Sequence, residues 1–288
     1  MSSTSDSGSD SGSDPGLDQE LADLALEAAR LAATLVRARA ADGVTVAATK
    51  TSDIDVVTEA DRAAETLIRD TIRARRPDDA FLGEEGDDEA GTTGVRWVID
   101  PIDGTVNFLY GLPQFAVSIA AEVDGRVVAG VVLNAATGTE YVARTEDGRT
   151  VARRDGRPIA VRAPAPLSHR LLATGFSYDR EVRVRQAEAL TRLIPHVRDV
   201  RRLGSCALDL CLVAEGSLDG YVEEGVNLWD HAAGGLIARA AGARTAIGTG
   251  VGGMSLLLCG PAHGFDELAQ AVEDAGFVVP DTMAPTGE

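Results

Sequence analysis

The stretch WVIDPIDGTVNFLYG, from Trp97 to Gly111, does most to restrict what this chain can fold into. Its first residues, Trp97 to Ile99, are apolar and typical of the end of a buried strand. Asp100 and Asp103 follow at once, separated only by a proline and an isoleucine, and a Gly-Thr pair comes directly after. Unpaired charge is costly beside an apolar strand. The fold must therefore bring something to this point that neutralises carboxylates.

The local chemistry of this stretch favours a bound cation and a bound phosphate. Pro101 restricts Asp100 to an extended backbone, so the turn can aim the carboxylates and the carbonyl oxygen of Ile102 at one point. Gly104 lets the backbone approach a ligand closely. The amides of Gly104 and Thr105, at the start of an expected short helix, would then hold a phosphate oxygen. The segment can gather metal ions and place a phosphate on them.

Further acids stand at the ends of other expected elements. They are Asp53, Asp55, Glu84, Glu85, Glu223, Glu224 and Asp230. The histidines are scattered along the chain and form no cluster with these acids. Carboxylates with a backbone carbonyl, without imidazole or thiolate, suit a hard cation such as Mg²⁺. A glycosidase with paired carboxylates is the alternative, but Asp100 and Asp103 lie too close in the sequence, among too many other acids, to favour it.

The order of expected helices and strands indicates the fold class. Apolar periodicity predicts a helix over 17–41 and a second one from Thr58 towards Pro77. Strand patterns fill 95–143, with a hairpin turn at VDGR. The later expected elements are a strand at 171–176, helices at 180–197 and 206–216, a strand at 218–225, a helix at 229–243, a strand at 255–260 and a helix at 263–276. This alternation lacks a strict βαβ rhythm, which favours a layered α+β fold over a doubly wound sheet.

The ends of the chain suggest its domain organisation. Residues 1–16 are a low-complexity acidic segment of Ser, Asp and Gly, which we expect to be a disordered tail. Residues 17–288 are expected to form a single domain. The N-terminus is not a basic region followed by an apolar one, and no apolar run reaches the ~18 to 20 residues of a membrane span. We therefore expect a cytoplasmic protein without a membrane anchor.

The composition narrows the range of possible binding partners. The formal net charge is -18, which disfavours nucleic acid as a main partner because phosphate backbones bind basic surfaces. Small phosphate compounds remain possible ligands, since a bound divalent cation can make the local charge positive. Cys206, Cys211 and Cys259 have neither CxxC nor zinc spacing, which indicates reduced, buried thiols.

Lys50 is the only lysine among the 27 basic residues. An arginine-biased genome would explain the excess of arginine and leave Lys50 without special meaning. The alternative is that this position needs a compact, rotatable ammonium group that a planar guanidinium cannot replace. The residues alone leave both interpretations open.

These motifs resemble the inositol monophosphatase family of Mg²⁺-dependent, Li⁺-sensitive phosphomonoesterases. The resemblance covers essentially residues 18 to 280. DPIDGTVNF matches the principal signature of the family, and WDHAAGGLIARAAGA resembles its second signature. FLGEE and DVVTEAD fit its remaining metal and water motifs. The resemblance implies a layered αβαβα sandwich, and a homodimer.

The resemblance also implies a set of metal ligands. Glu84, Asp100 and the carbonyl of Ile102 would bind one Mg²⁺. Asp100, Asp103 and Asp230 would bind a second. A weaker third ion would reach Glu84 through waters.

Catalytic and substrate roles follow from the same resemblance. Thr105, paired with Asp55, would orient and activate the attacking water, and Lys50 would face the site. The implied substrate contacts are Asp103, Gly104, Thr105, Gly204, Ser205, Cys206, Glu223 and Asp230. Cys206 stands where the family commonly has alanine, a departure that bears on polyol preference.

The resemblance predicts hydrolysis of myo-inositol 1-phosphate or a similar small polyol phosphate. Alternatives within the superfamily are histidinol phosphate, fructose 1,6-bisphosphate and 3′-phosphoadenosine 5′-phosphate. A further alternative is a regulatory protein that keeps the fold to bind a partner.

Overall fold

A computed structural model describes residues 14–42, 46–49 and 56–286. Most of the expected acidic tail therefore lies outside the described residues, as do Lys50 and Asp55. The first helix, α1 (Pro15–Asp42), begins at Pro15, two residues inside the segment expected to be tail.

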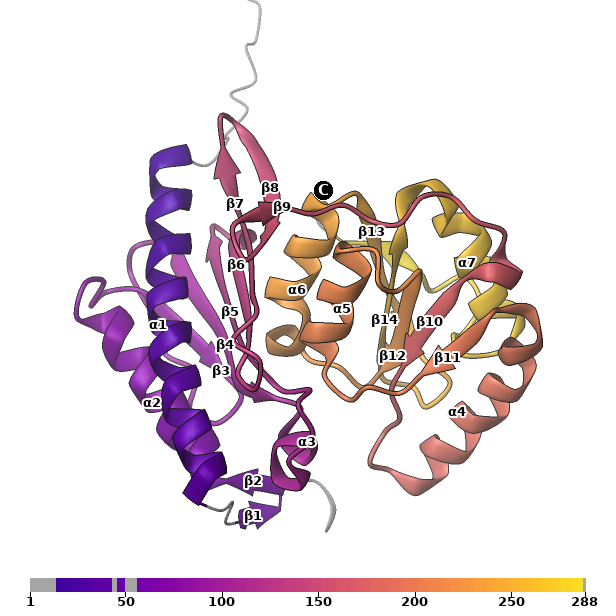
Figure 1. The fold of residues 1–288 in the computed structure, drawn as a ribbon, viewed down its shortest axis with the longest axis horizontal. Helices are drawn as coiled ribbons and strands as arrows, with labels where there is room; N and C mark the ends of the chain where they lie inside the picture. Colours follow the sequence, from indigo (N-terminus) through magenta and orange to yellow (C-terminus); the bar gives the residue numbers. More distant parts are fainter. Residues whose placement is uncertain (1–13, 43–45, 50–55, 287–288) are drawn as a thin grey trace, which may run out of the picture.

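The molecule is built in layers (Figure 1). Helices α1 and α2 (Glu59–Arg73) cover one face of the first sheet. Helices α5 (Cys206–Ala214) and α6 (Leu228–Ala240) lie between the first and second sheets. Helices α4 (Arg180–Leu193) and α7 (Phe265–Asp274) lie on the outer side of the second sheet. The αβαβα sandwich is confirmed.

The first sheet carries the expected hairpin. Its strands, in spatial order, are β3 (Ala80–Gly83), β4 (Val95–Asp103), β5 (Ala116–Val123), β6 (Arg126–Asn134), β7 (Glu140–Glu146), β8 (Arg149–Arg154) and β9 (Arg157–Pro158). β3 and β4 run parallel, whereas β4 and β5 run antiparallel. Asp124 and Gly125, between β5 and β6, both have positive φ, at 50° and 81°. Such a turn matches the twist of the flanking strands, which confirms the hairpin predicted at VDGR.

The second sheet contains strands that the sequence patterns did not predict. In spatial order its strands are β11 (Asp199–Arg201), β10 (Leu171–Thr174), β12 (Gly220–Glu224), β14 (Ser255–Pro261), β13 (Ala243–Thr249) and β15 (Ala284–Pro285). The missed strands are β11, β13 and β15. The helix expected to run through Ala243 ends at Ala240, because Gly242 takes a left-handed conformation with φ 100° and turns the chain into β13.

Smaller elements complete the architecture. β1 (Val46–Thr49) pairs antiparallel with β2 (Val56–Thr58), and α3 (Thr105–Tyr110) follows β4. Short 3₁₀ turns are η1 (Leu167–His169), η2 (Ile194–His196) and η3 (Ala262–Gly264). The helix expected over 180–197 ends as an α-helix at Leu193 and continues only as η2, since Pro195 cannot donate to a helical ladder.

The buried face of α1 consists mainly of alanine. Leu21 and Leu24 are buried as the leucine pattern predicted, but Leu31 is 45 % exposed. The other buried positions of the helix are Asp18, Val36 and the alanines 22, 25, 28, 29, 32 and 33. Small side chains let this helix lie close to the first sheet. Dispersion contacts over a close-packed face therefore replace the bulk that leucine would supply.

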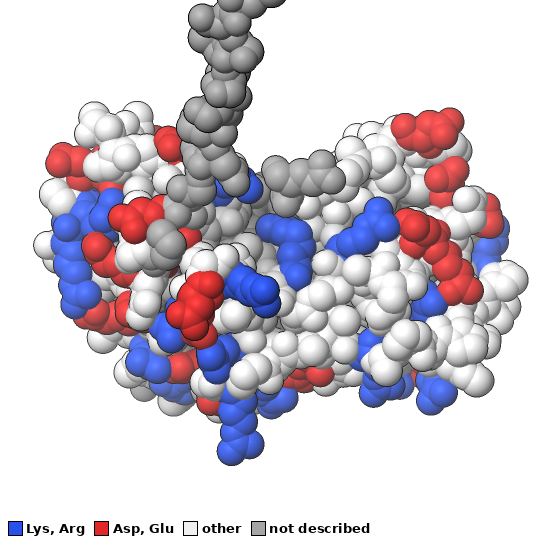
Figure 2. All heavy atoms as spheres, turned by 90° about the horizontal axis from the view of Figure 1, so that it is seen from above, with Lys and Arg blue, Asp and Glu red and all other residues white. Residues whose placement is uncertain are grey.

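The surface carries charges of both signs. Figure 2 shows acidic and basic side chains interspersed over the face seen from above. Within the described residues, no helix combines the length and the apolar character needed to cross a membrane.

Candidate active site

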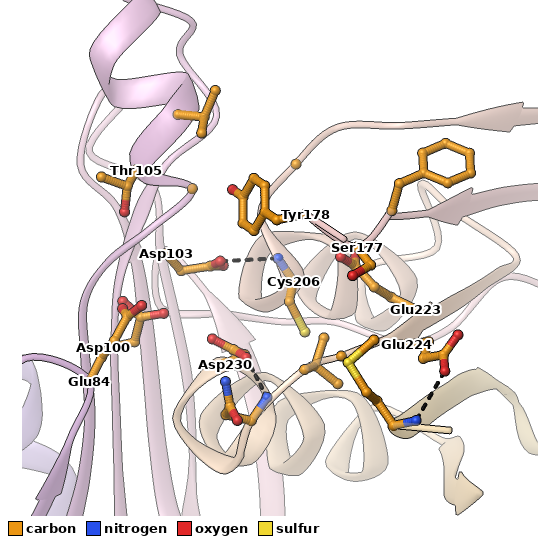
Figure 3. Close-up of a pocket in the computed structure, with 18 of the residues that line it drawn as sticks. Glu84, Asp100, Asp103, Thr105, Ser177, Tyr178, Cys206, Glu223, Glu224 and Asp230 are labelled. Atoms are coloured by element: carbon orange, nitrogen blue, oxygen red, sulfur yellow. Dashed lines mark hydrogen bonds between the residues drawn. The ribbon is translucent and has the colours of Figure 1, made fainter. Parts of the chain in front are cut away.

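A cavity of 1120 Å³ opens where β4 ends, between the first sheet and the ends of elements of the second half. Its wall includes Glu84, Asp100, Ile102, Asp103, Gly104, Thr105, Gly204, Cys206, Glu223 and Asp230, all predicted from the sequence as site residues. Figure 3 shows Glu84 and Asp100 on one side of the cavity and Glu223 on the other. Segments far apart in the sequence therefore meet in one place.

Parallel pairing of β3 and β4 brings Glu84 beside Asp100. Gly83 pairs with Ile99, so the residues that follow leave the sheet at the same edge. The turn after Glu84 is fixed from behind by the buried carboxylate of Glu65, which accepts bonds from the amides of Glu85 at 2.8 Å and Gly86 at 3.0 Å. Arg69 pairs with Glu65 at 2.7 Å. The acid pair at 84 and 85 thus contributes only Glu84 to the cavity wall.

The turn from Asp100 to Thr105 depends on a local hydrogen bond and on Gly104. The amide of Ile102 donates to Asp100 Oδ1 at 3.1 Å, and the sheet register shifts between Asp100 and Asp103. Gly104 has φ 92°, and a Cβ there would lie 2.8 Å from the carbonyl oxygen of Gln114. Only glycine fits this position without moving the backbone.

Asp103 faces the start of α5. Its carboxylate accepts bonds from the Ser205 hydroxyl at 2.6 Å, the Cys206 amide at 3.2 Å and the Ala207 amide at 2.7 Å. Burial nonetheless raises the pKa of Asp103 to about 7, against the opposing effect of the bonds from Ser205 and Ala207. The amides at a helix start favour a negative charge, which orients this carboxylate.

Asp230 is held in the same way at the start of α6. The amide of Asn227 donates to Asp230 Oδ2 at 2.5 Å. Burial raises the pKa of Asp230 well above its usual value, and the charges of Glu84 and Asp103 raise it further. Asp100 behaves alike: burial raises its pKa, followed by the charges of Glu84, Asp103 and Asp230. These carboxylates repel one another in a buried place.

This donor set fits a hard divalent cation in its chemistry. Every predicted ligand offers oxygen, as Mg²⁺ prefers, and a cation would relieve the repulsion that raises the pKa values of Asp100 and Asp230. In the part of the chain that the structure describes, no three His, Cys, Asp or Glu side chains converge closely enough to hold an ion as they stand. The bonds of Asp103 to α5 and of Asp230 to Asn227 turn these carboxylates partly away from Asp100.

The structure shows Asp61 within reach of the Thr105 hydroxyl, whereas the resemblance implied Asp55 as its partner. Thr105 Oγ1 lies 3.2 Å from Asp61 Oδ1 and 3.0 Å from the carbonyl oxygen of Ile102, and can donate its proton to either. Asp55, the partner expected from the resemblance, is outside the described residues. Asp61 is 1 % exposed and was missed as a site residue, although the DVVTEAD motif ends on it.

The opposite wall is organised by Tyr221. Its hydroxyl donates to Glu223 Oε2 at 2.8 Å. Burial raises the pKa of Glu223, whereas the bond from Tyr221 and the charge of Arg202 lower it. Gly175 makes room for this carboxylate, because a Cβ there would lie 1.8 Å from its carboxyl carbon. No sequence motif pointed to Tyr221 or Gly175.

Ser205 and Glu224 have structural partners. Ser205 is 1 % exposed, and its hydroxyl donates to Asp103 and accepts from the amide of Leu208 at 3.3 Å as the cap of α5. The structure thus places Ser205 behind Asp103. The carboxylate of Glu224 accepts bonds from the amides of Gly252 at 2.7 Å and Met254 at 3.1 Å, and from Gln186 at 3.1 Å. Glu224 lies on the cavity wall beside Glu223, but the chain itself supplies N–H donors to its carboxylate.

Asn107 joins the two walls. Its amide nitrogen donates to the carbonyl oxygens of Gln114 and Leu203, both at 2.7 Å. Leu203 precedes Gly204, which lines the cavity from the second half of the molecule. Asn107 therefore fixes α3 against the segment that leads into α5, a role hidden in the sequence because it is defined by contacts 96 residues away.

Comparison with known proteins agrees with this geometry. The sequence profile of the inositol monophosphatase family matches residues 17–273. Inositol-1-monophosphatase SuhB of Mycobacterium tuberculosis is 48 % identical over 243 residues, covering 82 % of this chain and 84 % of that protein. The solved structure of Mycobacterium tuberculosis SuhB has a TM-score of 0.76 at 41 % identity and covers 91 % of this chain and 99 % of that one. Nus factor SuhB of Pasteurella multocida is 39 % identical over 222 residues, 76 % of this chain and 82 % of that protein.

The family profile spans most of the chain, and the relatives align with it over most of their own length. The wall of the cavity includes residues 100 and 102–106 of the first family signature, DPIDGTVNF, and Trp229 and Asp230 of the second, WDHAAGGLIARAAGA. The chain therefore belongs to the inositol monophosphatase family and is a phosphoric monoester hydrolase.

Proposed function

We propose that this protein hydrolyses a small polyol phosphate, most simply myo-inositol 1-phosphate, to the polyol and inorganic phosphate. The observation that supports this is the meeting of Glu84, Asp100, Asp103 and Asp230 in one buried cavity, with Glu223 across from them. The name of the relative from Mycobacterium tuberculosis supports the same substrate.

We propose Mg²⁺ as the cofactor, two or three ions held by Glu84, Asp100, the carbonyl of Ile102, Asp103 and Asp230. When bound, Mg²⁺ would neutralise the phosphate dianion, lower the pKa of a bound water and stabilise the leaving alkoxide. Uncatalysed hydrolysis of phosphate monoesters is among the slowest reactions known, with enzyme accelerations up to ~10²¹. Strong electrostatic stabilisation is thus the main requirement on the site.

Thr105 is the proposed positioning group for the attacking water. When its hydroxyl donates to Asp61, its lone pairs are left to accept a hydrogen bond from that water. This bond aims the oxygen of the water at phosphorus. Asp55 and Lys50 remain proposed members of the same machinery.

Backbone and side chains on the remaining walls would fix the ester. The amides of Gly104 and Thr105 would donate to phosphate oxygens, with the tight turn at Gly104 bringing them close. Glu223, held by Tyr221, would accept hydrogen bonds from the polyol hydroxyls, together with groups of Gly204 and Cys206. Ser205, whose hydroxyl donates to Asp103, would take an indirect part in this contact.

The test is phosphate release with Mg²⁺ from myo-inositol 1-phosphate, histidinol phosphate, fructose 1,6-bisphosphate and 3′-phosphoadenosine 5′-phosphate, side by side. We expect preference for the first, loss of activity with EDTA and inhibition by Li⁺. Preference for another ester would keep the mechanism and change the substrate. Failure with every ester in the presence of Mg²⁺ would overturn the proposal.

A second candidate function is regulatory binding of a protein partner. It is favoured by the name Nus factor SuhB carried by a relative 39 % identical to this chain. The catalytically impaired Asp100→Asn protein distinguishes the two functions. A partner retained by this variant in a pull-down would support binding that is independent of turnover.

We further propose a cytoplasmic homodimer. Cys206, Cys211 and Cys259 are buried free thiols, which fits a reducing compartment. Light scattering on the purified protein and cell fractionation test these points separately. A monomer mass, or the protein in an exported fraction, would contradict them.

A further inference from the structure

Two glycines, Gly83 and Gly86, stand on either side of the acid pair Glu84 and Glu85. Neither glycine has the left-handed backbone that other residues rarely adopt. A Cβ on Gly83 would instead lie 2.3 Å from Glu65 Oε1, and a Cβ on Gly86 would lie 2.7 Å from the same atom. Both positions therefore lack a side chain for reasons of space, because the carboxylate of Glu65 lies against the turn.

The buried carboxylate of Glu65 reaches this turn from α2. It accepts bonds from two consecutive amides, those of Glu85 at 2.8 Å and Gly86 at 3.0 Å. These are the first two N–H groups after Glu84. Hydrogen bonds to an ionised acceptor are shorter and stronger than those to a neutral one. The main chain that carries Glu84 is therefore held firmly at the point where it leaves β3.

Arg69, one helical turn further along α2, holds the other side of the same turn. Its Nε donates to Glu65 Oε1 at 2.8 Å. Its Nη1 donates to the carbonyl oxygen of Asp87 at 3.1 Å and to Glu89 Oε1 at 2.8 Å. The guanidinium also lies over the ring of Phe81 on β3, 5.5 Å from the ring centroid. Because Arg69 and Glu65 are both buried, salt screens their interaction little.

Glu84 differs from two other predicted metal ligands in how it is positioned. The carboxylates of Asp103 and Asp230 accept bonds directly from amides at the starts of α5 and α6. The bonds from Glu65 and Arg69 reach the main chain and side chains around Glu84 instead. The place of the Glu84 carboxylate in the cavity therefore depends on how firmly its turn is fixed.

We infer that Glu65 and Arg69 are positioning residues of the proposed metal site, and that they hold residues 83–89 so that Glu84 is already in place when Mg²⁺ binds. This inference rests on the proposed function, since it assigns further residues to the same site. Neither of these two residues lines the cavity, so they act through Glu84 and not by contact with an ion. Loss of a partner behind a metal ligand typically lowers metal affinity by about ten- to a hundredfold, because the ligand must then be ordered during binding.

Calorimetric titration of the metal-free protein with Mg²⁺ alone tests the inference. Glu65→Gln keeps the size of the side chain but replaces an acceptor oxygen with an NH₂ group, which cannot accept from an amide or from Arg69. We expect its Mg²⁺ affinity to be about tenfold weaker than that of the wild type. Gly86→Ala should weaken binding similarly without removing a charge, because its Cβ would displace the carboxylate of Glu65.

Two other variants of α2 separate positioning from charge and from stability. Asp70→Asn removes the same unit of charge at an exposed position of the helix and should leave Mg²⁺ affinity unchanged. Ile72→Val trims a buried side chain and should lower the melting temperature without changing Mg²⁺ affinity. Wild-type affinity in Glu65→Gln and Gly86→Ala would overturn the inference, as would equal weakening in Ile72→Val. If Glu65→Gln does not fold, the titration of Gly86→Ala decides the question.

The wild-type titration separates failure of this inference from failure of the proposed function. Mg²⁺ binding that is the same in the wild type and in both variants of the turn refutes the inference alone. Absence of Mg²⁺ binding in the wild type refutes the proposed cofactor, and the inference with it. Phosphate release gives a second measurement. The Mg²⁺ concentration for half-maximal activity should rise about tenfold in Glu65→Gln, with kcat at saturating Mg²⁺ within about twofold of the wild type. A fall in kcat with an unchanged Mg²⁺ requirement would overturn the inference.

Discussion

Asp100, near the end of β4, and Glu224, at the end of β12, are both buried carboxylates, but the groups that surround them differ. Asp100, at the end region of β4, is buried among Glu84, Asp103 and Asp230, whose charges raise its pKa. Glu224, at the end of β12, is 3 % exposed and accepts bonds from the amides of Gly252 and Met254. Burial and position in a strand do not separate these residues. The donors around them do.

The difference distinguishes a structural carboxylate from one that needs a ligand. At Glu224 the protein itself supplies N–H groups, so the charge is satisfied in the folded chain. At Asp100 the nearest charged groups are other carboxylates, so the favourable partner must come from outside the chain. A bound cation is the simplest such partner, and substitutions at the two strand ends should have opposite consequences.

The largest effect is expected for Asp100→Asn. Loss of a ligand proposed to be shared by two cations should lower kcat by at least about a thousandfold. The metal-free protein should melt at the same or a higher temperature, because a buried carboxylate among like charges is removed. Phosphate release and melting in EDTA measure the two effects. Near-normal turnover would remove Asp100 from the site.

The pH dependence of stability should reverse with metal. The folded-state pKa of Asp103 is raised to about 7, above the ~3.9 of an unfolded chain. The protonated form therefore favours folding below about pH 4, and this stabilisation is lost as pH rises to 7. Urea unfolding in EDTA should show a lower free energy of unfolding at pH 8 than at pH 5.

Saturating Mg²⁺ supplies the control for this pH experiment. A cation bound to the ionised carboxylates should restore stability at pH 8 more than at pH 5, since protonation competes with binding. The same free energy of unfolding at both pH values in EDTA would show that Asp103 is not coupled to folding as its burial implies.

Glu224→Gln should lower the stability of the protein without changing its Mg²⁺ requirement, the converse of the effect expected for Asp100→Asn. The amide cannot satisfy the donors of Gly252, Met254 and Gln186 as a carboxylate does, and the cost should be about 1–3 kcal/mol of unfolding free energy. The Mg²⁺ concentration for half-maximal activity should stay the same. A large change in that concentration with unchanged melting would place Glu224 among the metal ligands.

A smaller effect is expected for Tyr221→Phe. Without the hydroxyl, Glu223 loses its bond at 2.8 Å, and the pKa of Glu223 should rise because that bond lowers it. KM for myo-inositol 1-phosphate should increase about fivefold with kcat little changed, as for a contact made equally in the ground and transition states. A fall in kcat at constant KM would instead assign Tyr221 a part in the chemical step.

Much of the site could be predicted because it consists of local signals. Asp100, Asp103 and Gly104 stand in one short segment, and its acids, proline and glycine together favour a tight turn that binds ions. Glu223 and Glu224 both line the cavity, as their place at the end of one expected strand predicted. The bonds of Glu224 to the amides of Gly252 and Met254 could not be predicted from this pattern.

The remainder depends on contacts between distant segments. The bonds of Asp103 to Ser205 and Ala207 join residues more than 100 positions apart, and no local pattern records them. The alanine face of α1 was missed for a related reason. Leucine periodicity marks an apolar stripe, but which side of the helix is buried depends on how closely the sheet approaches.

The smallest effect is expected at the N-terminus, the region least like the cavity. Removing residues 1–13 deletes an acidic segment of mainly Ser, Asp and Gly with little apolar surface to bury, and leaves α1 intact from Pro15. Melting temperature and kcat/KM should be unchanged within error.

Extending the deletion to residue 21 is the matched comparison. It also removes the buried Leu21 and Asp18, whose carboxylate accepts a hydrogen bond from Thr145 at 2.7 Å. That variant should melt several degrees lower. Equal loss of stability in both variants would show that the first residues, and not α1, make the stabilising contact.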